Sequence, residues 1–241
     1  MEHSDILRGF GLLIEGKQSL ESLYAYAPVY RFRYLDRNWV LKRTAVRSEA
    51  KAIAAWTSYL VSQGIGSVAP TQDFGKNPRS FPSGKNNTEE NWVIYPFIEG
   101  IPYTGNTNQI YSAGKLLGQI HAAGMKADFN LKVSKTVVAI EKKEIDQDIS
   151  IILQEIEKYA PEKLTNAQNI LNSYSQSYLE DVLPKLLKIN LPLTNCSWDY
   201  KANNLIYQND NSPILIDPDH GGRIPRMCDL ATALLLFHCD L

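Results

Sequence analysis

Cysteine is scarce in this chain, and an apolar run long enough for a membrane helix is missing. The 3 cysteines, Cys196, Cys228 and Cys239, are too few for a disulfide framework, and no CxxC spacing points to zinc. The longest strongly apolar run covers residues 230–237, whereas a bilayer-spanning helix needs about 20 residues. The N-terminus also lacks the basic start of a secretory signal. A soluble cytoplasmic protein without a membrane partner is therefore expected.

An excess of charge of either sign is missing as well. The 25 basic and 26 acidic residues give a net charge of −1, whereas binding to nucleic acid requires a basic surface. This balance argues against duplex nucleic acid as the main partner and leaves a local basic cleft open. Apolar residues make up 44% of the chain and charged residues 21%, which are the proportions of a globular protein. A chain of 241 residues accommodates one two-lobed domain or two small ones.

The first hundred residues have the pattern of an antiparallel sheet with one helix. Runs rich in β-forming residues predict strands over residues 29–34, 39–42, 68–74 and 92–97, with a hairpin turn at 36–38 and a long loop over 75–91. Between the second and third strands, residues 48–61 are predicted to be helical. Ile53, Trp56 and Leu60 fall on one face of that helix. Glu49 belongs to the same stripe, because it lies four residues before the first of them.

After residue 99 the pattern becomes mostly helical. Helices are predicted over residues 108–123, 140–159 and 166–188, the last interrupted at Pro184, with a final helix from Asp229. Short strands at residues 204–207 and 214–216 flank a turn at 208–213. The order of these elements is that of an α+β fold, with a boundary between two lobes at residues 99 and 100.

Three polar residues near the C-terminus form the pattern that carries chemistry. Asp199 comes first, Asn204 follows five residues later at the start of a strand, and Asp217 closes the partner strand. Phosphoryl transfer from ATP needs one carboxylate to orient the acceptor hydroxyl and take its proton. It also needs an amide and a second carboxylate to hold magnesium against the phosphates. Neighbouring strands lie about 5 Å apart, so a hairpin would keep the last two groups close together.

With its surroundings, this pattern resembles the aminoglycoside phosphotransferase-like family of small-molecule kinases, whose relatives include choline and homoserine kinases. The family's loop reads roughly His-Gly-Asp, four variable residues and Asn, followed by Ile-Asp and then Asp-Leu-Ala. The same order and spacing occur here in Asp199, Asn204, Ile216-Asp217 and Asp229-Leu230-Ala231. Residues 92–100 are similar to the family's hinge strand, and residues 117–121 to its first long C-lobe helix.

The resemblance implies a protein-kinase-like two-lobed fold. Residues 1–99 are expected to form a nucleotide-binding N-lobe with an antiparallel sheet and a helix. Residues 100–241 are expected to form a mainly helical C-lobe with the catalytic β-hairpin and the acceptor site. The chain ends twelve residues after Asp229, where family members continue with further helices. It is therefore expected to be a fragment, a truncated product or a minimal variant.

The resemblance also implies the roles of the acidic and amide side chains. Asp199 is the expected catalytic base, and Asn204 and Asp217 are the expected magnesium ligands. Asp219 is either a local partner within its loop or a group that reaches a second metal or a cationic substrate. Asp229 is expected to be structural, tying the catalytic loop to the following helix.

For the nucleotide, the resemblance implies contacts from the first hundred residues. Lys42 is expected to neutralise phosphate charge and to be oriented by Glu49. The alternatives are an ordinary lysine at a strand end and a solvent-facing glutamate that suits the helix dipole. In the hinge, the carbonyl of Pro96 and the N–H of Ile98 are the expected contacts to the adenine edge, since proline can still offer its carbonyl.

The implied function is magnesium-assisted, ATP-dependent phosphorylation of a hydroxyl on a small molecule, such as an aminoglycoside, an amino alcohol, homoserine or a sugar. The alternative is a catalytically impaired relative that only binds nucleotide. Residues 23–30, the expected phosphate-covering turn, favour that alternative because they hold no glycine. Ser197 and Trp198 also stand where the family has His and Gly. A protein kinase is disfavoured, since no Asp-Phe-Gly or Ala-Pro-Glu segment follows the hairpin.

Other polar residues receive structural interpretations. His121 is expected to be a satisfied core histidine, and Cys196 a buried and unreactive thiol. In residues 141–162 acidic side chains outnumber lysines. This segment is expected to be a solvated helix face, with an acidic wall for a cationic acceptor as the alternative.

Overall fold

The computed structural model describes residues 2–13, 20–44, 47–83, 89–133, 140–189, 191–209 and 212–239. Residues 84–88 and 210–211, in the predicted loop 75–91 and the predicted turn 208–213, lie outside the described residues. The chain divides into two compact units, one of Met1–Lys132 with Thr194–Leu241 and one of Val133–Leu193. The lobe boundary predicted at residues 99 and 100 lies inside the first unit.

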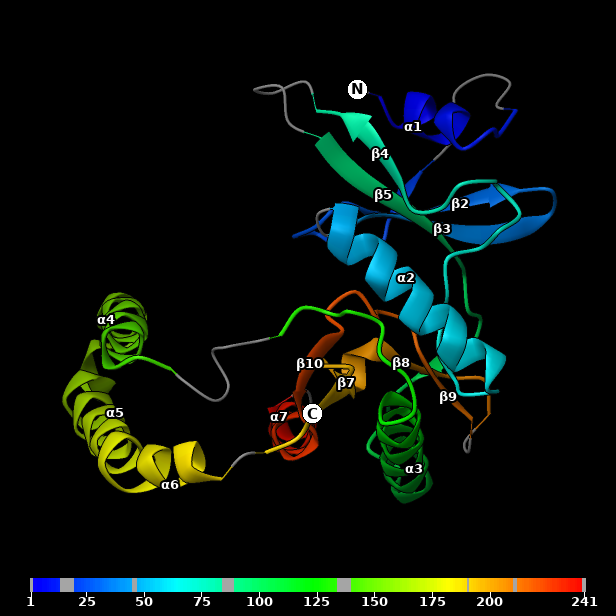
Figure 1. The fold of residues 1–241 in the computed structure, drawn as a ribbon. Coiled ribbons are helices and arrows are strands. Elements are labelled where there is room, and N and C mark those ends of the chain that lie inside the picture. Colours follow the sequence, from blue (N-terminus) through cyan, green and yellow to red (C-terminus); the bar gives the residue numbers. More distant parts are fainter. Residues whose placement is uncertain are drawn as a thin grey trace. The chain divides into compact units, whose positions relative to one another are not determined.

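An antiparallel sheet of five strands dominates the N-terminal part of the first unit (Figure 1). Its strands are β1 (Glu21–Ser22), β2 (Val29–Tyr34), β3 (Arg37–Thr44), β4 (Arg79–Pro82) and β5 (Glu89–Pro96), in the order β1-β2-β3-β5-β4. The predicted hairpin is confirmed, because Val29 at the start of β2 pairs with Lys42 near the end of β3. Side chains alternate between the faces of a strand, so Leu41 and Lys42 project from opposite faces of this sheet.

One face of the sheet is covered by α1 (His3–Gly9), a helix that the sequence analysis did not predict. Ile6 and Leu7 of α1 are buried against Phe32, Leu41 and Ile94 of the sheet. The other face carries a smaller cluster that includes residues from both β5 and the C-terminal hairpin. Its members are Val68, Val93 and Tyr95, with Val40, Ile98, Ile214 and Ile216 packed against them.

The predicted strand over residues 68–74 is wrong, and β4 instead falls inside the predicted loop. Pro70 has no N–H to give to a ladder. The side chain of Asn77 takes the place of a strand at this part of β5. Its Nδ2 donates to the carbonyl of Ile94 at 2.7 Å, and its Oδ1 accepts from the N–H of Ile94 at 3.0 Å. A single parallel bridge joins Ser67 to Leu215 of the C-terminal hairpin.

Two long helices form the main core of the first unit. These are α2 (Arg47–Ser62) and α3 (Thr107–Gly124), both close to the predicted bounds. The predicted apolar face of α2 is confirmed, since Ile53, Trp56 and Leu60 are all buried in the cluster that also includes Leu117 of α3. The side chain of Asn106 caps α3 by accepting from the N–H of Asn108.

Short strands in the C-terminal segment carry the loop with Asp199. The three-stranded sheet has the order β6-β8-β9, from β6 (Ile101–Pro102), β8 (Leu205–Tyr207) and β9 (Pro213–Leu215). The two-stranded sheet joins β7 (Leu193–Cys196) to β10 (Gly222–Pro225), and α7 (Arg226–Cys239) follows. The predicted hairpin of β8 and β9 is confirmed. Strands β7 and β10 were not predicted, and α7 begins three residues before Asp229.

The second unit is helical. It consists of α4 (Lys142–Tyr159), the 3₁₀ turn η1 (Pro161–Lys163), α5 (Leu164–Ser177), the π-helical turn η2 (Tyr178–Val182) and α6 (Leu183–Lys188). The predicted interruption at Pro184 takes the form of this π turn. Pro184 cannot donate to the carbonyl four residues earlier, and the N–H of Leu183 bonds to the carbonyl of Tyr178, five residues back.

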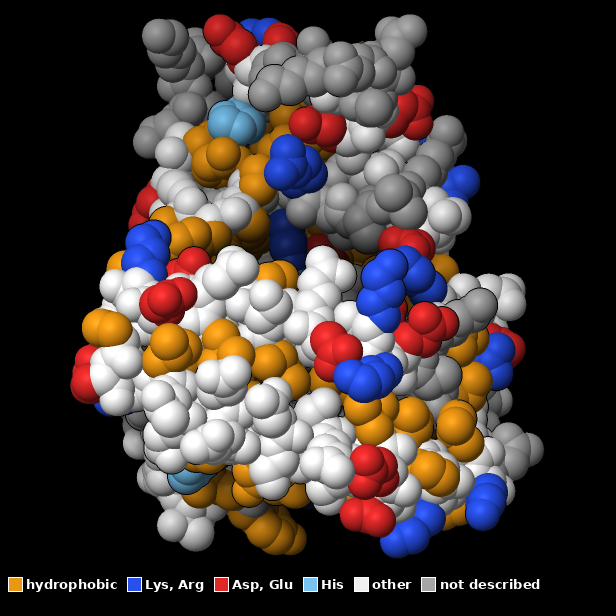
Figure 2. All heavy atoms as spheres, turned by 90° about the vertical axis from the view of Figure 1, so that its left-hand side faces the viewer, with side chains coloured by type: hydrophobic (Ala, Val, Ile, Leu, Met, Phe, Trp, Pro, Cys, Tyr) orange, Lys and Arg blue, Asp and Glu red, His pale blue; other side chains and the backbone are white. Residues whose placement is uncertain are grey.

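None of the described residues in these helices is buried. Apolar side chains such as Ile151, Tyr159, Tyr174 and Leu187 are exposed, and the face drawn in Figure 2 shows apolar side chains between charged ones. Even so, no helix within the described ranges is long and apolar enough to cross a membrane.

Gly66 positions β9, and replacing it tests that contact. A Cβ atom at residue 66 would overlap the carbonyl oxygen of Pro213, so Gly66→Ala must push β9 away. We expect it to lower the free energy of unfolding by about 1–3 kcal/mol, as other overpacked sites do. Urea unfolding measures the change.

The matched control is Gly114→Ala, on the exposed side of α3. A Cβ there meets no heavy atom within 4 Å, and alanine is the better helix former. The control is expected to be neutral or stabilising by up to about 1 kcal/mol. Equal stability of the two variants would contradict the close approach of residue 66 to β9.

Candidate active site

Asp199 and Asn204 face each other across one turn, which ends in the short helix η3 (Ala202–Asn204). The Nδ2 of Asn204 donates to Asp199 Oδ2 at 3.0 Å and to the Asp199 carbonyl at 2.9 Å. The Nζ of Lys201 lies 3.0 Å from the same carboxylate oxygen. No contact from the described part of the chain involves Asp199 Oδ1. This second oxygen is therefore available to an incoming hydrogen-bond donor.

Asn204 and Asp217 stand at the open end of the hairpin. The N–H of Ile216 donates to the carbonyl of Asn204 at 2.9 Å, just beyond the paired residues Leu205 and Leu215. Asp217 therefore leaves β9 beside Asn204, as the sequence predicts. The structure thus links the three candidate residues through one turn and one hairpin.

Lys42 of β3 joins this group from the sheet. Its Nζ donates to Asp217 Oδ1 and lies 3.1 Å from Asp219 Oδ2. The lysine side chain is only 13% exposed. Burial lowers the pKa of Lys42, but the charges of Asp219 and Asp217 outweigh burial, so its pKa is raised above the ordinary value. Lys42 is therefore a charged ammonium held at the hairpin, which is what a phosphate-neutralising lysine requires.

Asp219 is the most enclosed acid of the group, with a side chain 7% exposed. Its Oδ1 accepts a hydrogen bond from Tyr95 Oη at 2.5 Å. Its Oδ2 lies 3.1 Å from Lys42 Nζ and forms an ion pair with it. Burial, followed by the charge of Asp219, raises the pKa of Tyr95 well above its usual value, and Tyr95 therefore remains a donor.

The predicted pairing of Glu49 with Lys42 is not formed among the described residues. Glu49 Oε1 instead lies 3.3 Å from Nζ of Lys132, and its side chain is 30% exposed. Lys42 is already held by two carboxylates, so its charge is neutralised without Glu49. A role for Glu49 in nucleotide binding stays a prediction.

The hinge candidates lie at the end of β5. The N–H of Phe97 donates to the carbonyl of Asn38 at 3.2 Å, which makes these two residues a hydrogen-bonded pair of the ladder. Hydrogen-bonded and non-hydrogen-bonded pairs alternate along an antiparallel ladder. The next pair, Trp39 with Pro96, is therefore not hydrogen-bonded, and the carbonyl of Pro96 points away from β3. Ile98 is half-buried and packs on the cluster with Tyr95. The direction of the Pro96 carbonyl is compatible with the predicted adenine contact, which stays a prediction.

Asp229, at the start of α7, anchors the loop that carries Asp199. Its carboxylate is fully buried, and it accepts from the N–H of Ser197 at 3.3 Å and of Trp198 at 2.9 Å. His121 Nε2 lies 2.8 Å from Asp229 Oδ2. Both interpretations from the sequence are confirmed: Asp229 ties the loop to a helix, and His121 is a satisfied core residue.

Cys196 lies beside this anchor, and burial raises the pKa of its thiol to about 12. The thiol therefore stays protonated at neutral pH, as expected for an unreactive cysteine. Ligand atoms of His121, Cys196 and Asp229 lie within 4.8 Å of one another. Because both oxygens of Asp229 already accept hydrogen bonds, we interpret this group as structural.

Trp198 adopts a left-handed backbone conformation with φ of 64°. The resembled family has glycine at this position, and glycine takes such a φ without steric cost. For a bulky residue the conformation costs about 1–2 kcal/mol. The bond from the Trp198 N–H to Asp229 stabilises the turn against this cost.

The predicted phosphate-covering turn is the connection between β1 and β2, at residues 23–28. Tyr24 and Tyr26 in this turn are both exposed, with ring centroids 5.5 Å apart. The side chain of Ser22 donates to the carbonyl of Tyr24 at 3.2 Å. The turn therefore exists at the predicted place, with tyrosines at its surface where the family favours glycine.

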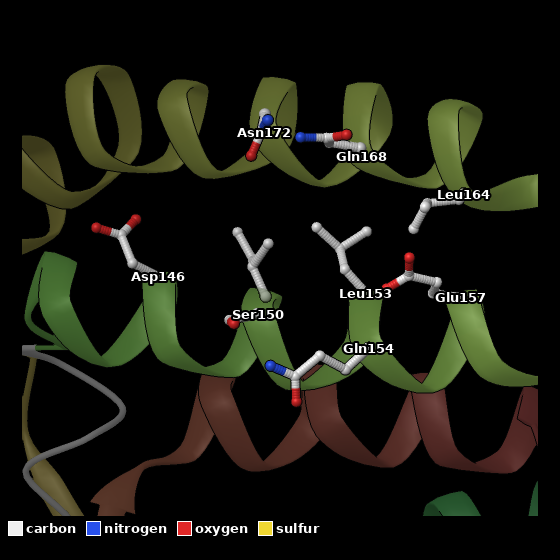
Figure 3. A pocket seen from close by; sticks show the side chains of 9 residues that line it. Asp146, Ser150, Leu153, Gln154, Glu157, Leu164, Gln168 and Asn172 are labelled. Carbon is white, nitrogen blue, oxygen red and sulfur yellow. The ribbon is translucent and has the colours of Figure 1, made fainter. Parts of the chain in front are cut away.

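The second unit has a groove of its own between α4 and α5, of about 390 Å³ (Figure 3). Its lining combines carboxylates, amides and leucines: Asp146, Ile149, Ser150, Leu153, Gln154, Glu157, Leu164, Gln168 and Asn172. One of its carboxylates, Asp146, pairs with Lys142 at 2.7 Å. The predicted acidic face of this segment thus borders a groove, and an acceptor-binding role for it stays a prediction.

The residues at the hairpin fit a magnesium ion. Asn204 uses its Nδ2 for both bonds to Asp199, which turns its Oδ1 away from that carboxylate. With Asp217 this gives hard oxygen donors of the kind that Mg²⁺ prefers. Two carboxylates against one ammonium also leave the group of Lys42, Asp217 and Asp219 with a formal charge of −1. This negative excess would attract a divalent cation.

Sequence reasoning missed two residues of this group. Lys201 contacts Asp199, and its position two residues after the aspartate is a signal that could have been used. Tyr95 was considered only as part of the hinge strand. Its bond to Asp219 depends on a tertiary contact across 124 residues of sequence, for which no local pattern exists.

Comparison with known proteins identifies the class. A profile of the phosphotransferase enzyme family matches residues 25–240, whereas no curated protein matches in sequence. The chain therefore belongs to the phosphotransferase enzyme family.

Solved structures share the fold at low sequence identity. Amicoumacin kinase hAmiN, in complex with AMP-PNP, Ca²⁺ and Ami, aligns with a TM-score of 0.71 at 15% identity, over 98% of this chain and 69% of that one. Spectinomycin phosphotransferase APH(9)-Ia, in complex with ADP and spectinomycin, aligns with a TM-score of 0.58 at 15% identity. This alignment covers 89% of this chain and 66% of that one. Choline kinase LicA from Streptococcus pneumoniae aligns with a TM-score of 0.56 at 15% identity, over 98% of this chain and 75% of that one. The expected α+β, protein-kinase-like fold is therefore confirmed.

Removing the anchor tests its importance for the loop. Asp229→Ala leaves the N–H groups of Ser197 and Trp198 without their buried acceptor. We expect the free energy of unfolding to fall by about 2–5 kcal/mol, since each unsatisfied buried donor costs about 1–3 kcal/mol. Urea unfolding measures it.

Asp146→Ala is the control, because Asp146 forms an exposed ion pair with Lys142 at 2.7 Å. Its loss is expected to cost less than about 1 kcal/mol. Comparable losses in the two variants would show that Asp229 is not an anchor.

Proposed function

We propose that the protein transfers a phosphoryl group from ATP to a hydroxyl of a small molecule, with magnesium. The observation that carries this proposal is the linkage of Asp199, Asn204 and Asp217 with Lys42 at one hairpin. Family membership and the nucleotides named for similar structures, AMP-PNP and ADP, support the same conclusion.

Each side chain has a definite task in this proposal. Asp199 Oδ1 accepts the hydrogen bond of the acceptor hydroxyl and takes its proton as the oxygen attacks. Lys201 and Asn204 hold the other oxygen, Oδ2, so the carboxylate cannot rotate freely. Asn204 and Asp217 would hold the magnesium ion, which supplies charge neutralisation at the phosphates. Lys42 places a further positive charge at the phosphates, and positioning with charge neutralisation supplies most of the rate.

At the hinge, we assign the carbonyl of Pro96 and the N–H of Ile98 to the adenine edge. The direction of the Pro96 carbonyl, away from β3, supports this assignment. The acceptor is a small molecule with a hydroxyl group, and the spectinomycin and choline named for two similar proteins make cationic acceptors worth testing first.

The direct test is a screen of ATP consumption with magnesium against aminoglycosides, amino alcohols, homoserine and sugars. Turnover with one class supports the proposal and identifies the acceptor. The alternative, a relative that only binds nucleotide, is favoured by the exposed tyrosines of the turn at residues 23–28. Binding of MgATP without turnover on any acceptor would support that alternative and contradict phosphoryl transfer.

Asp199→Ala tests the proposed base. Because Asp199 is proposed to bind the acceptor hydroxyl rather than ATP, we expect kcat to fall by about 10²–10⁴-fold, while the KM for ATP stays within about three-fold. Steady-state kinetics with the acceptor from the screen gives both values. Asp148→Ala, an exposed acid on α4, is the control. A normal kcat in Asp199→Ala would remove this residue from its role.

Asp217→Ala tests the metal site. We expect the Kd for ATP, measured by calorimetry with Mg²⁺, to rise by at least about ten-fold, because a metal ligand is lost. With EDTA in place of Mg²⁺, the variant should no longer bind ATP more weakly than wild type, because only the metal-dependent part of ATP binding needs Asp217. An unchanged Kd with Mg²⁺ would place the metal elsewhere.

A further inference from the structure

We propose that Asp219 and Tyr95 position Lys42. The resemblance had given this task, orienting the lysine, to Glu49. The proposal rests on the proposed function, because it names the groups that hold the lysine at the phosphates of ATP. It concerns residues that act through Lys42 rather than on the substrate.

A lysine that meets phosphates needs an anchor other than a metal ligand. Its four-carbon stem is flexible, and fixing it costs up to about 2 kcal/mol of side-chain entropy. Lys42 contacts Asp217 and Asp219. If Asp217 held magnesium, its carboxylate would be shared with a divalent cation and would hold the ammonium less tightly. Asp219 is then the remaining anion for Lys42.

The carboxylate of Asp219 is itself fixed on both sides. Its Oδ1 accepts from Tyr95 Oη at 2.5 Å, and its Oδ2 lies 3.1 Å from Lys42 Nζ. Tyr95 is only 3% exposed, so water does not compete freely for this bond. Asp219 therefore links the ammonium of Lys42 to a buried hydroxyl of β5.

The sheet places Tyr95 and Lys42 on the same face. Lys42 pairs with Val93 and Val40 pairs with Tyr95, and residues two apart on a strand share a face. The same face packs against Ile216 of the hairpin, next to Asp217. Lys42, Tyr95 and Asp219 therefore meet where β3, β5 and the hairpin come together.

Helix α2 takes no part in this arrangement. Glu49 of α2 pairs with Lys132 at 3.3 Å, and no contact joins it to Lys42 within the described ranges. The position of the lysine therefore depends on the sheet and the hairpin, not on where α2 lies.

The first experiment compares Asp219→Asn, Tyr95→Phe and Glu49→Gln by calorimetry, with MgATP and with adenosine as probes. Adenosine has no phosphates, so a misplaced Lys42 should weaken MgATP only. We expect the Kd for MgATP to rise about ten-fold in Asp219→Asn and about three-fold in Tyr95→Phe, with less than two-fold change for adenosine. Partial unfolding would instead lower the binding stoichiometry of both probes.

Matched controls are Asp128→Asn and Tyr111→Phe, which change an exposed aspartate and an exposed tyrosine. A Kd for MgATP in Asp219→Asn equal to that of wild type would overturn the proposal. A larger rise in Glu49→Gln than in Asp219→Asn would overturn it as well and return the task to Glu49.

A second experiment does not depend on ATP, so it separates this proposal from the proposed function. Melting temperatures of Lys42→Met, Asp219→Asn and the double variant form a thermodynamic cycle. We expect the two shifts to be non-additive by about 3 °C or more, because Lys42→Met takes the ammonium from buried Asp219, and Asp219→Asn leaves Lys42 with Asp217 as its anionic contact. The cycle of Lys42→Met with Glu49→Gln should be additive within about 1 °C.

Additive shifts for Lys42 and Asp219 would overturn the pairing, whatever the protein binds. Absence of MgATP binding in the wild-type protein would contradict the proposed function, while the cycle would still decide whether Asp219 holds Lys42.

Discussion

The contact of one enclosed lysine with two carboxylates unites the candidate site. Lys42 comes from β3, whereas Asp217 and Asp219 follow β9. Asp217 lies 175 residues after Lys42 in the chain. Burying charges is costly unless they are paired, so this group is stable only while the sheet and the hairpin stay together. Its formal charge of −1 makes the same place suitable for a divalent cation and the phosphates it accompanies.

A second buried acid, Asp229, fixes the loop that carries Asp199. Asp229 fixes the backbone at Ser197 and Trp198 and thereby the direction in which Asp199 leaves the loop. The left-handed conformation of Trp198 is strained, and strain of this kind persists only where the surroundings impose it. The geometry of the candidate site therefore depends on a carboxylate outside the proposed chemistry.

Local patterns were sufficient for much of this architecture. The hairpin of β2 and β3, the face of α2 and the hairpin of β8 and β9 follow from alternation and helical periodicity, and the structure confirms them. The spacing of Asp199, Asn204 and Asp217 likewise predicted that these residues lie close together, and one turn and one hairpin link them in the structure. Resemblance to a known family, rather than periodicity, gave each of these residues its expected role.

Other features depend on tertiary contacts that no local pattern contains. The edge of β5 is completed by the side chain of Asn77 instead of the predicted strand over residues 68–74. Strands β7 and β10 are four residues each, too short for a clear alternation. Glu49 has the right position on α2, yet it pairs with Lys132, because Lys42 is already neutralised by acids far away in the sequence.

The most direct measurement is a crystal structure with Mg²⁺ and AMP-PNP. The account predicts a metal about 2.1 Å from Asn204 Oδ1 and an Asp217 oxygen, with Lys42 Nζ in contact with a phosphate oxygen. Nucleotide bound away from the hairpin, or a metal held by neither of these two residues, would contradict it.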